Sequence, residues 1–276
     1  MFSLNSRSFL FFAGLTVLVA APQDPRNASG PDKPKAFAKA FAGVPKVVVN
    51  PSRDQIMPFV YDGNGWTTRF MLANLDNHSI VVKVQFWAQD GSNLSLPVDG
   101  IGNTTAVEVT LPPGGNYSFV TSGFAPDQTT GYAYVSSNNG SDYFGGYAIA
   151  RNRTSRQPDI EMTVPLTPVD ENIFTLAFDN TGGYTTYAVL INSSGTFKAN
   201  INVSVQDSQG NVLATDQILV DPYGRYAFNL ADYYPVDGLV GNVYFSSTGQ
   251  QYVAGSGLRA GPNQSLTIIP TLSLAR

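Results

Sequence analysis

The stretch Asp62-Gly-Asn-Gly-Trp66-Thr67-Thr68, followed by Asn74, decides the fold because the chain repeats it as Asp179-Asn-Thr-Gly-Gly-Tyr184-Thr185-Thr186, followed by Asn192. A later segment also recurs: Pro113-Gly-Gly-Asn-Tyr117-Ser-Phe119 returns as Pro222-Tyr-Gly-Arg-Tyr226-Ala-Phe228. Matching segments are offset by roughly 105 to 119 residues, which is the length of a small domain and far longer than a solenoid turn. The sequence therefore predicts two copies of one module.

The composition favours strands over helices. Charged residues make up 13% of the chain and aromatic residues 12%. The only glutamates are Glu108, Glu161 and Glu171. Long surface helices draw on Glu and Lys, whereas Gly, Pro, Asn, Ser, Thr and aromatic residues are typical of strands and tight turns.

Apolar residues alternate with polar ones along several segments, as Val82, Val84 and Phe86 do with Lys83 and Gln85. This period of two predicts strands with one buried face. The expected strands of the first module are 67–74, 82–86, 107–111, 117–120, 132–136, 144–151 and 160–164, and those of the second are 185–192, 201–206, 217–220, 225–230, 242–246, 252–259 and 266–269.

About seven antiparallel strands in each module predict an all-β protein made of two tandem β-sandwich domains of the immunoglobulin-like kind. A small barrel is the competing fold. We place the modules at 51–167 and 168–276, joined by a short link that limits their relative freedom.

The first 21 residues read as a secretory signal peptide, because Arg7 precedes a short apolar run that ends in small residues. We expect cleavage after Ala20, and the alternative is an uncleaved anchor. Residues 22–50 contain five prolines among Asn, Gly and Lys and are expected to form a largely disordered linker. No later segment is apolar enough to span a bilayer.

The charge is uneven along the chain. From residue 51 onward there are 18 acidic and 10 basic side chains, a balance of −8, so nucleic acid is not an expected partner. Cysteine is absent, which excludes disulfides and thiol chemistry. An exported chain without cysteine indicates a bacterial protein, either secreted or held in the cell envelope.

The usual catalytic patterns are missing. The single histidine, His78, lies near Asp76 but follows no nucleophile motif, and we interpret it as an exposed turn residue. Most acidic residues sit in turns, where carboxylates cap backbone amides. No catalytic residue and no cofactor is therefore expected, although the turns 90–93 and 138–142 offer oxygens of the kind that calcium prefers.

Aromatic residues are the remaining candidates for ligand binding, because exposed rings can stack on sugar faces. Features found in one copy only are the better candidates, since the fold does not require them. They are Trp87 and the pair Tyr233 and Tyr234. Tyr143, which follows an Asn-Gly-Ser-Asp turn, is a further candidate.

With its paired Thr-Thr strands and its repeated Pro-x-Gly-x-Tyr-x-Phe turn, the chain resembles secreted bacterial proteins of uncharacterised activity built from tandem immunoglobulin-like sandwiches. The resemblance covers residues 55 to 272 and rests on turn and core features. It implies a fold and no activity, and it offers no functional residues to carry over.

The leading hypothesis is a non-catalytic exported protein of the cell surface or matrix, or an accessory recognition module. The first alternative is a carbohydrate-binding protein that uses the aromatic residues named above. The second is a self-assembling envelope or filament subunit in which residues 22–50 contact a neighbouring copy. A hydrolase would need converging carboxylates, or Asp76 and His78 beside a serine.

Overall fold

A computed structural model of the chain describes residues 54–140, 142–153, 159–169, 171–247 and 252–274. The expected signal peptide and linker lie outside this range. Residues 51–276 form one compact unit, which is nearly all β-structure. Among the described residues, no helix is both long and apolar enough to cross a membrane.

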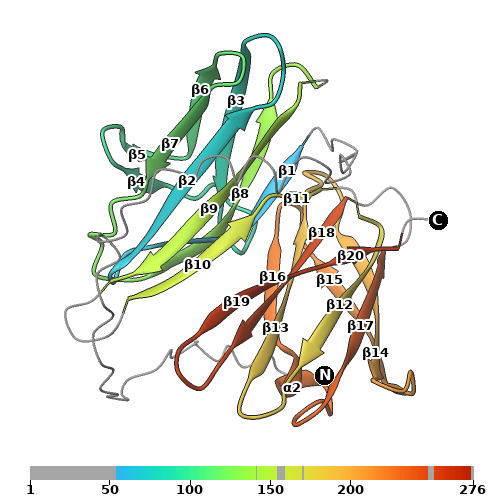
Figure 1. The fold of residues 1–276 in the computed structure, drawn as a ribbon. Helices are drawn as coiled ribbons and strands as arrows, with labels where there is room; N and C mark the ends of the chain where they lie inside the picture. Colours follow the sequence, from blue (N-terminus) through green and yellow to red (C-terminus); the bar gives the residue numbers. More distant parts are fainter. Residues whose placement is uncertain (1–53, 141, 154–158, 170, 248–251, 275–276) are drawn as a thin grey trace, which may run out of the picture. The chain divides into compact units, whose positions relative to one another are not determined.

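The strands divide into two sets in chain order (Figure 1). The first half contains β1 (Gln55–Asp62), β2 (Trp66–Asn74), β3 (Ile80–Trp87), β4 (Leu96–Val98), β5 (Gly102–Thr104), β6 (Ala106–Leu111), β7 (Asn116–Val120), β8 (Thr129–Ser137), β9 (Phe144–Asn152), β10 (Ile160–Pro165) and β11 (Thr167–Pro168). The expected boundary at 167/168 falls within β11, which pairs with β1 and so belongs to the first half.

The second half contains β12 (Ile173–Asp179), β13 (Thr185–Asn192), β14 (Ala199–Asp207), β15 (Val212–Val220), β16 (Arg225–Asn229), α2 (Leu230–Tyr233), β17 (Val240–Ser247), β18 (Val253–Ala260), β19 (Leu266–Pro270) and β20 (Leu272–Ser273). The strand expected at 225–230 ends one residue early, because Asn229 caps the short helix α2 by accepting a bond from the amide of Ala231.

The two halves have the same sheet topology. The first half has a sheet of order β11-β1-β8-β3-β6 and a second of order β10-β9-β2-β7. The second half has β20-β12-β17-β14-β15 and β19-β18-β13-β16, which is the same order strand for strand. These are open antiparallel sheets rather than a closed barrel. Within the described ranges, the small hairpin β4-β5 occurs in the first half and has no counterpart in the second.

This order differs from that of immunoglobulin domains, where the first two strands share a sheet. Here β1 pairs with β8 while β2 pairs with β9 in the opposite sheet. The same separation holds in the second half, where β12 pairs with β17 and β13 with β18.

Alternation along the strands determines which face is buried. In β3, Ile80, Val82, Val84 and Phe86 are buried, whereas the residues between them are half-buried. Each half has an aromatic centre of fully buried rings, formed by Phe59, Phe70, Phe86 and Tyr132 in the first half and by Phe174, Phe178, Phe228 and Phe245 in the second. Burial of such rings supplies most of the stability of a sandwich that has no disulfide.

The buried core of the first half continues into the second. Val189 and Ile191 of β13, with Ala254 and Leu258 of β18, belong to the same buried cluster as the core of the first half. Their neighbours in β13, Ala188 and Leu190, point into the core of the second half. Strand β13 is therefore buried on both faces, and the two halves share a hydrophobic interface.

Polar contacts also join the halves. Pro58 has no amide hydrogen, and the pairing of β1 with β8 shifts register between Met57 and Val60. The carbonyl of Pro58 accepts a hydrogen bond from Nε of the buried Arg225 at 3.0 Å. The amide of Arg225 donates to the carbonyl of Gln89 at 2.9 Å.

Candidate functional site

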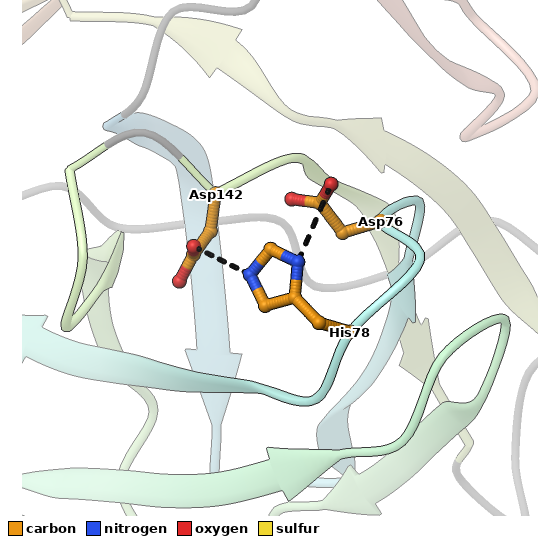
Figure 2. Close-up of side chains that lie close together, drawn as sticks. All are labelled: Asp76, His78 and Asp142. Carbon is orange, nitrogen blue, oxygen red and sulfur yellow. Dashed lines mark hydrogen bonds and ion pairs between the residues drawn. The ribbon is translucent and has the colours of Figure 1, made fainter.

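Three chemically reactive side chains meet on one edge of the first half (Figure 2). Asp76 and His78 lie in the loop between β2 and β3, and Asp142 lies in the segment between β8 and β9. Nε2 of His78 is 3.2 Å from Oδ1 of Asp142, and Nδ1 is 3.8 Å from Oδ1 of Asp76. The two carboxylates thus approach opposite sides of the imidazole ring.

The position of Asp76 is set by the buried Asn74. The amide group of Asn74 donates to the carbonyls of His78, Leu111 and Pro112 at 2.7, 3.0 and 2.9 Å, and its Oδ1 accepts from the amide of Asp76 at 2.8 Å. The other oxygen of Asp76, Oδ2, accepts from the amide of Tyr143 at 2.8 Å. The loop that carries Asp76 and His78 is therefore held at both ends.

Asp142 is a buried carboxylate. Only 4% of its surface is exposed, against 54% for the His78 side chain. Among the described residues, the imidazole is the hydrogen-bond partner of the Asp142 side chain. Burial of a carboxylate is costly without compensating partners, so the contact with His78 matters for both groups.

The second half repeats the scaffold without the cluster. Asn192 donates to the carbonyls of Phe197, Val220 and Asp221, and its Oδ1 accepts from the amide of Ser194. Ser194 therefore corresponds to Asp76, and Phe197 to His78. Because the same loop forms there without the charged residues, the fold does not require Asp76 and His78.

The cluster does not form a catalytic triad. Within the described part of the chain, the imidazole nitrogens contact Asp76, Asn77 and Asp142, and no hydroxyl group bonds to His78. A hydrolase could use Asp142 as a partner for the imidazole, but among the described residues no nucleophile lies beside His78. The arrangement can instead hold a proton or a metal cation.

The two turns that were considered as calcium sites have different environments in the structure. In the turn 90–93, Oδ1 of Asp90 accepts from the amide and the hydroxyl of Ser92 at 3.0 and 2.6 Å, and these bonds hold the pKa of Asp90 below its usual value. That carboxylate caps its own turn. The segment 138–142 contributes Asp142 to the cluster.

The aromatic residues singled out from the sequence have different environments. The ring of Trp87 stacks on Tyr223 of the second half, with centroids 4.1 Å apart and planes inclined by 18°. Tyr223 therefore covers one face of the indole. Tyr234 is buried, and its hydroxyl donates to Oδ2 of Asp216 at 3.2 Å, while burial raises its pKa.

Tyr143 and Tyr233 remain exposed. Tyr143 is 47% exposed and directly follows Asp142, so it lies beside the charged cluster. Tyr233 is the last residue of α2 and packs edge-on against Phe228, with ring centroids 5.3 Å apart. These two residues keep the accessible ring that a sugar-binding role needs.

Sequence reasoning found His78 and Asp76 but missed Asp142 as their partner. His78 is exposed and in a turn, as expected. Asp142 lies 64 residues away in the chain, and no spacing pattern connects the two. The sequence held only an indirect signal for Asp142. This residue lies in one of the oxygen-rich turns and directly precedes Tyr143, whereas the corresponding Tyr252 of the second half is not preceded by an acidic residue.

We compared the chain with known families, proteins and structures. No family model, no curated protein and no solved structure matches this chain. The fold and the cluster are therefore the basis for a function.

Proposed function

We propose that the chain is an exported, non-catalytic recognition or structural protein of the cell surface or extracellular matrix. Two sandwich units, derived from one duplicated module, act as a single rigid body in this role. The signal-like start of the sequence and the absence of a nucleophile beside His78 within the described residues support this role.

The observation that carries the proposal is the hydrophobic core shared by the two halves. Enzymes that work at a domain junction need a cleft that admits substrate, whereas here Val189 and Ile191 of β13 pack into the core of the first half. A continuous core limits hinge motion and gives fixed spacing to loops at both ends of the body. Such stiffness suits a protein that displays surfaces rather than one that closes on a substrate.

The test combines export and rigidity. The full chain, produced in a bacterial host, is expected in the periplasm or medium with its new N-terminus after Ala20, as read by mass spectrometry. The mature protein is expected to show one rotational correlation time for both halves by NMR relaxation. Retention of the chain in the cytoplasm, or two independently tumbling halves, would overturn the proposal.

Carbohydrate binding is the second candidate, and the exposed ring of Tyr143 favours it. The backbone amide of Tyr143 donates to Oδ2 of Asp76 at 2.8 Å, so the half-buried carboxylate of Asp76 lies near this residue and can accept a hydrogen bond from a sugar hydroxyl, while the ring stacks on an apolar sugar face. Affinity electrophoresis in gels that contain a panel of polysaccharides tests this candidate. Tyr143→Ala is expected to abolish retardation, and Tyr252→Ala, at the corresponding exposed position, is the control.

No retardation of the wild-type chain in any gel would exclude the sugar-binding role. Retardation lost in Tyr233→Ala instead of Tyr143→Ala would move the site to α2.

A further inference from the structure

The hydrogen bond to Asp142 determines which imidazole nitrogen is available. A carboxylate oxygen accepts hydrogen bonds, so the 3.2 Å contact between Nε2 of His78 and Oδ1 of Asp142 favours the tautomer with its hydrogen on Nε2. In the neutral imidazole, Nδ1 then carries a lone pair. That lone pair points away from the buried carboxylate.

Among the residues that the structure describes, Nδ1 of the imidazole faces two oxygen atoms and no hydrogen-bond donor. Oδ1 of Asn77 is 3.4 Å away, and Oδ1 of Asp76 is 3.8 Å away. Two oxygen atoms therefore lie within 3.8 Å of Nδ1, on a ring that is mostly exposed. Lone pairs held this close repel one another unless a proton or a metal cation lies between them.

The distances match those between ligands of one metal ion. Two ligands of a tetrahedral cation with bonds of about 2.0–2.1 Å lie roughly 3.4 Å apart. The contacts of 3.4 and 3.8 Å around Nδ1 are close to this value. The buried Asp142 then takes the place of the carboxylate that orients a metal-bound histidine through its second nitrogen.

We infer that Asp76, Asn77 and His78 bind one divalent cation, with Zn²⁺ as the best-matched ion and Asp142 as the residue that positions the imidazole. An imidazole nitrogen with a carboxylate oxygen is a donor set that Zn²⁺ takes in proteins. Imidazole suits Zn²⁺, whereas Ca²⁺ takes oxygen ligands. The remaining coordination positions face solvent, since His78 is mostly exposed.

Comparison of the two halves supports a role in binding over a role in folding. The second half closes the same loop with Ser194 and Phe197, neither of which provides an ionic ligand. Sequence drift in a structural loop gives no reason for two carboxylates to converge on one imidazole. Their convergence in one half only is what a dedicated ion site requires.

The experiment uses the fact that the chain contains one histidine. Zn²⁺ is titrated into isotope-labelled chain that carries no affinity tag, and the imidazole resonances are followed by NMR, with calorimetry for stoichiometry. We expect one Zn²⁺ per chain, with the ion on Nδ1 and the hydrogen retained on Nε2. A parallel titration with Ca²⁺ is expected to leave the imidazole resonances unchanged.

Variants assign the roles. His78→Gln is expected to abolish binding, and because the ring is exposed this variant should fold. Asp76→Ser, which introduces the residue of the second half, is expected to weaken binding by at least about tenfold. Asp142→Asn is expected to weaken it by about 10- to 100-fold, as loss of a partner that orients a metal-bound histidine does. Asp90→Asn is the matched control and should bind as the wild type does.

Three results would overturn the inference. One is an imidazole that responds to pH but not to Zn²⁺, since a proton then occupies Nδ1. Another is unchanged affinity in His78→Gln. A third is a site that takes Ca²⁺ in preference to Zn²⁺.

Discussion

Trp87 and Tyr223 stack face to face across the two halves, with ring centroids 4.1 Å apart. The backbone carbonyl of Tyr223 also accepts a hydrogen bond from the hydroxyl of the buried Tyr132 at 2.8 Å. Tyr223 reaches this position with a positive φ of 53°, which is uncommon for a residue other than glycine. A local strain is thus maintained by contacts between the halves.

Removal of this ring should therefore weaken the junction. We expect Tyr223→Ala to lower the free energy of unfolding by about 2–4 kcal/mol, from lost ring burial and lost stacking. Urea denaturation measures the loss, and Trp87 emission should shift to longer wavelength in the native state. Tyr252→Ala, which removes an exposed tyrosine from the same half, should change stability by no more than about 0.5 kcal/mol.

The buried Arg225 should act mainly through its volume. Among the described residues no carboxylate pairs with its guanidinium, and burial lowers its pKa. An apolar side chain of similar length often replaces a buried charge without loss, whereas a cavity costs about 2–5 kcal/mol. Arg225→Met is thus expected to be more stable than Arg225→Ala by at least about 2 kcal/mol in urea. Equal stabilities would show that the charge, rather than the volume, matters.

Asn74 and Asn192 should be equally important. Each amide satisfies three backbone carbonyls, and loss of buried partners costs about 1–3 kcal/mol per group. We expect Asn74→Ala and Asn192→Ala each to lower the free energy of unfolding by about 2–4 kcal/mol, with Asn103→Ala on the exposed β5 as a neutral control. A large effect at one asparagine and none at the other would contradict the equivalence of the halves.

Asp179 should make stability depend on acid pH. Hydrogen bonds from Thr181 and the charge of Arg259 hold its pKa below the usual value. A depressed carboxylate pKa contributes stability above the unfolded-state pKa, and this contribution is lost as the pH falls through the folded-state pKa. Asp179→Asn is therefore expected to be less stable than the wild type at pH 7, with a difference that shrinks as the pH falls below about 3.9, the usual pKa of an unfolded Asp. Melting temperatures measured from pH 7 to pH 2 check this, and a constant difference would contradict it.

The repeated residues made much of the fold predictable. Thr68 and Thr186 were expected to be equivalent, and each side chain bonds to the main chain of the residue seven positions earlier, Tyr61 or Asp179. The clean alternation of β3 gave its buried face correctly. Local patterns succeed where one strand has one dry face and one wet face.

The junction and the site were harder to predict. In β13 the run Tyr187-Ala-Val-Leu-Ile191 is apolar on both faces, which signals double burial but not its partner. The indole of Trp87 lay on the polar phase of β3, yet Tyr223 from the second half covers it. Asp142 meets His78 only because β8 and β9 return the chain to the β2–β3 loop, and a pattern of local spacing holds no information on such a return.

The doubly buried β13 also decides how the protein can be divided. A fragment that began near residue 171 would leave Val189, Ile191 and Leu258 facing water, and such an apolar patch promotes aggregation. Although the chain is built from two similar halves, the smallest fragment suited to a fusion protein is the whole of residues 51–276.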